Sequence, residues 1–203
     1  MPGKHYTRLT KKKIFDYFTC MFAPAPGILL IADPFLKDPN FKRTVVILCE
    51  HQDEGSVGFV LNRTFDYKLS ELINDMDDCD VPVYYGGPVQ MDTIHFLHSY
   101  PDLIPGGNEI AKDVYWGGNF ETVMALLRSG SISPDKIRFF LGYSGWGSGQ
   151  LRDELNEKSW LTVDATHQLV FRTTTDSIWQ NSLRHLGGDY EMMVHFPIDP
   201  QLN

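Results

Sequence analysis

The sequence predicts a single α+β domain in which helices flank a mixed β-sheet. Its 203 residues suffice for one sizeable core, and a content of 42% hydrophobic and 22% charged residues indicates a folded protein. Apolar runs of strand length recur along the chain, and some are joined by connections too short for a crossover. Amphipathic segments lie between these runs, and no linker or low-complexity tract divides the chain.

The first half of the domain is predicted to be mainly strands. Residues 27–32 form an apolar run, and residues 43–50 form a β-branched run typical of a strand buried on both faces. The polar turn at 51–55 is too short for a parallel connection, so 43–50 and 56–62 should form an antiparallel hairpin. Further elements are a short helix near 69–73 and short strands at 81–85 and 93–97.

The second half alternates strands and helices. After a strand at 113–116, Asn119 is placed to cap a helix that runs through Leu127. Strands at 137–141 and 160–163 flank a helix that begins near Ser148. A last helix starts after Thr175 and stops at Gly187-Gly188.

The N-terminus differs in charge from the rest of the chain, and we divide the sequence accordingly. Residues 1–24 are expected to be a basic arm with a short helix, and residues 25–203 a single α/β domain. The first thirteen residues hold five positive charges and no acid; the net charge is −8, so the remainder carries −13. Asp16 and the prolines after residue 23 argue against a signal peptide, and no apolar run reaches the ~18 residues of a membrane span. We therefore expect no membrane partner.

Cysteine and histidine usage indicates a cytoplasmic protein without a metal or cofactor. The three cysteines, Cys20, Cys49 and Cys79, are widely spaced and suit a reducing compartment. Cys49 is expected to be a small buried hydrophobe. His95 and His98 should point to opposite faces of a strand. The acidic loop at 75–80 departs from the calcium-loop pattern.

The segment from Phe139 to Leu155 holds the candidate site. It is predicted to be a buried strand, a glycine-rich loop at 142–149 and a helix, an arrangement whose free backbone N–H groups can bind an anion. No serine of the loop fits the Gly-x-Ser-x-Gly pattern of a nucleophile elbow, and the dinucleotide and P-loop patterns also fail, so we assign no catalytic residue. The competing interpretation is a purely structural turn. The candidate ligand-binding residues are Ser144, Gly145, Gly147, Ser148, Gly149 and Arg152.

Two tryptophans bracket the helix that follows this loop. Trp146 and Trp160 are large apolar side chains at either end of one element. We expect them to be buried and to hold the helix on the sheet.

Several blocks together resemble a known family. They are GILLIADP at 27–34, RTVVIL at 43–48, GSVGFVLNR at 55–63, YGGPV at 85–89, and GYSGWGSGQL at 142–151 followed by Glu154 and Trp160. In this order they resemble the bacterial YqgE/AlgH family over roughly residues 25 to 190. The resemblance implies a cytoplasmic protein with a bent, partly barrel-like sheet and no established enzymatic activity. Some members are labelled as transcriptional regulators, and the family offers no agreed catalytic residues.

Three functions follow as hypotheses. The first is a non-enzymatic binding or regulatory protein that acts through a protein or a small anionic ligand. The alternative is an enzyme, or a sensor of an anion or nucleotide, that uses the loop at 142–149. The third, direct binding of DNA, is disfavoured because the domain is acidic and its helix after Gly149 carries more acids than bases.

Overall fold

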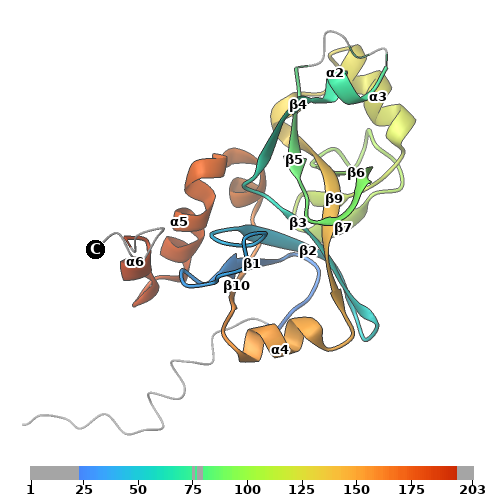
Figure 1. Ribbon diagram of the computed structural model, residues 1–203. Coiled ribbons are helices and arrows are strands. Elements are labelled where there is room, and N and C mark those ends of the chain that lie inside the picture. The colour runs from blue at the N-terminus through green and yellow to red at the C-terminus, as the bar shows by residue number, and fades with distance from the viewer. Residues whose placement is uncertain (1–22, 75, 77–79, 196–203) are drawn as a thin grey trace, which may run out of the picture.

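The computed structural model describes residues 23–74, 76 and 80–195. A curled sheet forms the centre of the molecule, with α4 and α5 against its lower and left sides and α2 and α3 at its far end (Figure 1). The strands are β1 Ile28–Ala32, β2 Val45–Gln52, β3 Gly55–Val60, β4 Thr64–Lys68, β5 Pro82–Tyr85, β6 Val89–His98, β7 Asn108–Ala111, β8 Val114–Trp116, β9 Ile137–Gly147 and β10 Trp160–Asp164. The helices are α2 Leu69–Leu72, α3 Phe120–Arg128, α4 Gln150–Asn156, α5 Thr175–Leu186 and α6 Tyr190–Met193, with a 3-10 turn at Pro134–Lys136 and a π-helical segment at Gln168–Arg172.

The sheet is mixed, as the sequence predicts. Its order is β10-β1-β2-β3-β9-β6-β8-β7, and the pair β4–β5 joins it through β9. The β5–β9 pair is parallel and the other ladders are antiparallel. A Cβ atom added at Gly27 would lie 2.0 Å from the carbonyl oxygen of Ile110. The residue before β1 is therefore close in space to β7, although the two are far apart in the sequence. The expected bent, partly barrel-like sheet is confirmed.

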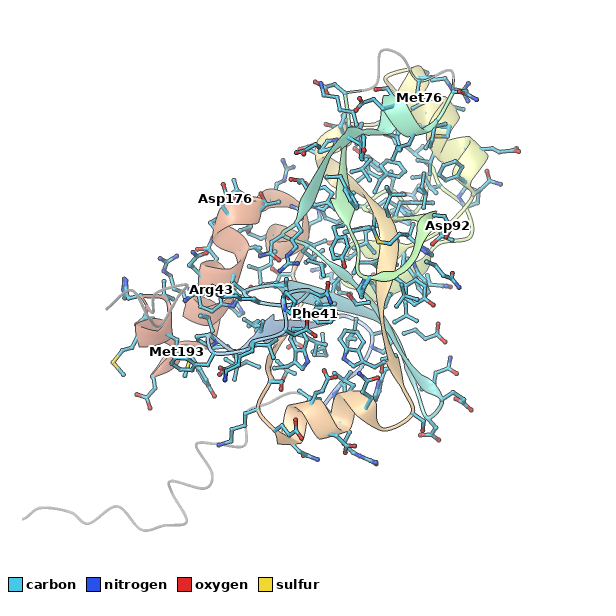
Figure 2. All side chains as sticks on the ribbon, in the orientation of Figure 1. Phe41, Arg43, Met76, Asp92, Asp176 and Met193 are labelled. Atoms are coloured by element: carbon cyan, nitrogen blue, oxygen red, sulfur yellow. The ribbon has the colours of Figure 1, made fainter. Side chains whose placement is uncertain are left out.

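Three apolar cores pack against the sheet. One lies between the sheet and α5, and a second lies between the sheet and α3. The third lies between the sheet and α4, where Phe41 packs against it (Figure 2). Alternation along each strand separates these cores: on β2, Val46 and Leu48 face the third core, and Ile47 and Cys49 face the first.

Both long helices lie where the sequence predicts them. The Asn119 side chain accepts a hydrogen bond from the backbone N–H of Thr122 at 2.8 Å, which caps α3. The α5 helix buries Ile178, Trp179 and Leu183, and the Trp179 indole donates to the Ala32 carbonyl oxygen at 2.9 Å. This bond ties α5 to the end of β1.

The structure of the glycine-rich segment differs from the prediction. The strand expected at 137–141 continues to Gly147, so most of the predicted loop at 142–149 is strand and the turn is confined to Ser148 and Gly149. Tertiary pairing overrides the turn-like composition here, because glycines allow strands to approach closely. A Cβ at Gly55, opposite Gly147, would lie 2.4 Å from the Trp146 carbonyl oxygen.

Some predicted features lie outside the described residues. These are the basic arm, the short helix expected within residues 1–24 and most of the acidic loop at 75–80. Within the described ranges, no helix is long and apolar enough to cross a membrane.

Candidate functional site

A β-bulge at the end of β2 sets the geometry of the candidate site. Leu48 lies opposite Gly58, but Glu50 lies opposite Val57, so β2 has one extra residue at this point. A bulge reverses the alternation of side chains and often re-aims one near a functional site. Beyond the bulge, Glu50 shares the face of Val57, and His51 shares the opposite face with Ser56.

The first pocket lies between the β2–β3 hairpin end and the turn from β9 into α4. It encloses about 320 Å³. Within it, His51 Nδ1 and the Ser56 hydroxyl are 2.7 Å apart and share a hydrogen bond. The Ser56 side chain is buried. The pocket is lined by His51, Gln52, Asp53, Gly55, Ser56, Gly147, Ser148, Gly149, Leu151 and Arg152.

Arg152 supplies the full positive charge of this pocket. Its guanidinium folds back over the turn, since a Cβ at Gly149 would lie 3.2 Å from Arg152 Nη2. Gly149 has a φ of +75°, a conformation that favours glycine. In the described part of the chain, Arg152 makes neither a hydrogen bond nor an ion pair. Asp53 lines the same pocket and offsets part of its charge.

The structure brings four of the six predicted site residues together. Gly147, Ser148, Gly149 and Arg152 line the first pocket. The Gly147 N–H already donates to Gln150 Oε1 at 3.1 Å, so it is occupied within the fold. Ser144 lies elsewhere: its side chain is fully buried, and its hydroxyl donates to the Gly86 carbonyl oxygen at 2.9 Å.

Gly145, the sixth predicted residue, lines a second groove on the opposite face of the same strands. This groove encloses about 410 Å³. The sequence does not predict this groove, because the bulge that turns Glu50 into it has no clear sequence signal. It is lined by Glu50, Gln52, Glu54, Gly55, Ser56, Val57, Val89, Tyr143, Gly145 and Trp146.

The two tryptophans of the motif have a structural role, as predicted. Both are buried, and both indole N–H groups donate to Glu154 Oε2, from Trp146 at 2.9 Å and from Trp160 at 2.7 Å. Phe41 stacks on Trp146 and meets the edge of Trp160. One carboxylate oxygen therefore joins β9, β10 and α4, and this cluster is satisfied without a ligand.

Other candidate groups are enclosed by the fold. Cys49 is buried, as expected, and burial raises the pKa of its thiol well above the ordinary value. His95 and His98 face opposite cores across β6, where they contact Tyr143 and Tyr115 respectively. Burial lowers the pKa of both imidazoles. Among the described residues, no group of three His, Cys, Asp or Glu side chains lies close enough together to hold a metal ion.

The chain was compared with known proteins by sequence and by structure. The chain is 47% identical to a UPF0301 protein of Chlorobium limicola over 88% of this chain and 95% of that protein, and 46% identical to one of Chlorobaculum parvum over 87% and 95%. Its structure resembles the solution structure of AlgH from Pseudomonas aeruginosa, with a TM-score of 0.67 and 28% identity over 87% of this chain and 98% of that one. A crystal structure of a Corynebacterium diphtheriae protein shares the fold, with a TM-score of 0.72 and 20% identity over 90% and 97%. A model of the AlgH-like family matches residues 29–191, and the chain belongs to that family.

Proposed function

We propose that this protein is a cytoplasmic, non-enzymatic ligand-binding protein that takes a small molecule by an anionic group in the first pocket. The observation that carries the proposal is the Arg152 guanidinium, which lies over Gly149 at the pocket without a hydrogen-bond or ion-pair partner among the described residues. A guanidinium offers several N–H donors in a fixed plane and suits carboxylate and phosphate groups. His51 and the Ser148 hydroxyl supply further polar contacts on the same pocket wall.

The positive charge comes from Arg152 rather than from the helix itself. The α4 helix has only seven residues, and Asp153 in its first turn offsets its dipole. Occupancy of the pocket would change the ordering of the turn at Ser148 and Gly149. This turn connects β9, which carries Trp146, to α4, which carries Glu154.

We do not propose that the protein regulates transcription by binding DNA directly. The net charge is −8, and α4 with its C-terminal cap carries Asp153 and Glu157 as well as Arg152. Binding to DNA requires a basic face that neutralises phosphates. We expect no footprint on promoter DNA at physiological salt in the presence of competitor DNA.

An enzyme is the second candidate, because the Ser56 hydroxyl lies 2.7 Å from His51 Nδ1 in the same pocket. A serine that shares a hydrogen bond with an imidazole is the first requirement of nucleophilic catalysis. The two residues are also direct cross-strand partners, and their register brings them together without any catalytic demand. Hydrolysis of p-nitrophenyl acetate that disappears in Ser56→Ala would favour the enzyme, and its absence would favour the binding protein.

The test is a titration of isotope-labelled protein with inorganic phosphate, citrate and a nucleoside monophosphate. Amide shifts are followed at Ser148, Gly149 and Leu151, and we expect saturable shifts with at least one of these anions. Arg152→Gln should weaken that binding by about tenfold to a hundredfold, since one charged hydrogen bond contributes about 1.5–3 kcal/mol. Arg184→Gln is the matched control, because Arg184 lies on α5 and is bonded to Asn181. If no anion shifts these amides at millimolar concentration, the turn is purely structural and the proposal fails.

A further inference from the structure

We propose that the second groove is a binding site for an organic cation, a primary ammonium or guanidinium group carried on a short apolar stem. The groove lies on the face of β2, β3 and β9 opposite the first pocket, and it encloses about 410 Å³. Its lining includes two carboxylates, two aromatic residues and two valines. The groove shares Gln52, Gly55 and Ser56 with the first pocket, but the charged residues of the two differ, so either proposal can fail without the other.

The strand register builds the floor of the groove. Glu50, Val57 and Gly145 are consecutive cross-strand partners on β2, β3 and β9, so their side chains share one face. Tyr143 and Val89 form the neighbouring row on β9 and β6 and lie on the same face, because Tyr143 is two residues from Gly145. The apolar floor therefore has a carboxylate at one end and an aromatic ring at the other.

Glycine at position 145 lets the aromatic wall close over the backbone. A Cβ added there would lie 3.1 Å from Tyr143 Cε2 and 3.7 Å from Val89 Cγ2. The Tyr143 ring also meets the His95 ring edge to face, with centroids 6.0 Å apart, which restrains its orientation. A ring restrained in this way can present a face to a cation, an attraction that grows when water is excluded.

The charge of the groove favours a cation. Glu50 and Glu54 both line it, and none of its ten lining residues is Lys, Arg or His. The Gln52 amide donates to Glu50 Oε1 at 2.7 Å and holds this half-buried carboxylate in place. The second carboxylate oxygen, Oε2, accepts no hydrogen bond from the described residues and is available to a ligand N–H.

The bulge at the end of β2 provides an independent reason to regard the groove as built for binding. In a regular ladder, Glu50 would follow Val46 and Leu48 onto the face that packs against α4. The bulge places it opposite Val57 instead, on the groove face. A bulge disrupts local pairing, and bulges occur preferentially where they re-aim a side chain beside a site. An apolar floor with two carboxylates fits an alkyl stem with a cationic end better than a hydrated metal ion, which prefers oxygen ligands alone.

The experiment titrates the full-length labelled protein with n-butylammonium chloride and, as matched probes, with n-butanol and sodium butyrate. We expect saturable shifts at Val57, Val89 and Gly145 with butylammonium, and no saturable shift with the other two. Glu50→Gln should weaken butylammonium binding at least fivefold, and Tyr143→Leu should weaken it more than Tyr143→Phe. Asp53→Asn, which removes a carboxylate from the other pocket, should leave it unchanged.

Three results would overturn this proposal. The first is shifts of equal size with butanol, which would show a merely apolar groove. The second is displacement of butylammonium by millimolar calcium at equal ionic strength, which would show a metal site. The third is butylammonium binding that Glu50→Gln leaves unaltered in a variant whose spectrum is otherwise that of the folded protein. Arg152→Gln tests only the anion pocket, so failure there leaves the cation groove unaffected.

Discussion

The two sides of the β9–α4 segment differ in whether their polar side chains are hydrogen-bonded within the fold. On the side that faces the sheet, Glu154 Oε2 accepts hydrogen bonds from both indoles, and Phe41 fills the space beside them. On the side that faces the hairpin end, Arg152 covers Gly149 without a bond to any described residue. A short stretch of chain therefore combines a closed structural cluster with an open, charged pocket.

This difference separates the half of the motif that stabilises the fold from the half that we propose to bind a ligand. Buried polar groups must find partners within the fold, and the indole N–H groups have done so. An exposed guanidinium has no such requirement and is available to a ligand. Substitutions on the side that faces the sheet should therefore lower stability, and substitutions on the side that faces the hairpin end should leave stability almost unchanged.

Trp160→Ala should have the largest effect. Trp160 is only 1% exposed, and replacing a buried tryptophan with alanine typically costs about 3–5 kcal/mol. For a chain of this size the melting temperature should fall by roughly 10 °C, which calorimetry measures. Met192→Ala is the control, because Met192 is 64% exposed and its loss should change little. A melting temperature unaltered in Trp160→Ala would contradict the structural role of the cluster.

Glu154→Leu should have the next largest effect. It leaves two indole N–H groups without their acceptor, and an unsatisfied buried donor costs about 1–3 kcal/mol. Urea unfolding followed by tryptophan fluorescence measures the loss. Glu157→Leu, an exposed carboxylate at the end of the same helix, is the matched control. Equal losses in the two variants would show that Glu154 does not hold the cluster together.

The sequence predicted the closed side better than the open side, for physical reasons. Two tryptophans around an amphipathic segment indicate a buried clamp whatever the strand register, and an asparagine before a helical pattern indicates a cap, as at Asn119. The pockets depend instead on long-range pairing. The bulge before Glu50 and the continuation of β9 to Gly147 arise from neighbours far along the chain, and glycine composition alone suggested a turn. The second groove was missed for the same reason.

We expect the two histidines of β6 to cause a smaller change in stability that depends on pH. His98 accepts a hydrogen bond from the Tyr100 N–H at Nδ1 and donates from Nε2 to the Gly117 carbonyl oxygen, so its ring is held neutral. Burial lowers its pKa and that of His95, although the bond to Gly117 opposes the shift at His98. The unfolded chain therefore binds protons more readily, and stability is full above the unfolded value of about 6.5 and falls as the pH drops below it.

Urea unfolding between about pH 7.5 and 5.5 measures this loss, in a window above the ordinary pKa of carboxylates. His98→Gln should reduce the pH dependence of the free energy of unfolding, and His95→Gln separates the second contribution. A free energy of unfolding that stays constant across this window would show that neither imidazole changes its affinity for protons on folding.

Arg152→Gln should have the smallest effect on stability and gives the most direct test of the comparison. An exposed side chain that makes no hydrogen bond or ion pair within the described residues usually contributes within about 0.5 kcal/mol. Its melting temperature should therefore match that of the unaltered protein, while Glu154→Leu on the same helix is clearly destabilised. A loss in Arg152→Gln as large as that in Glu154→Leu would mean that the guanidinium supports the fold. The contrast between a closed side and an open side would then be wrong, and Arg152 would no longer be a candidate ligand-binding residue.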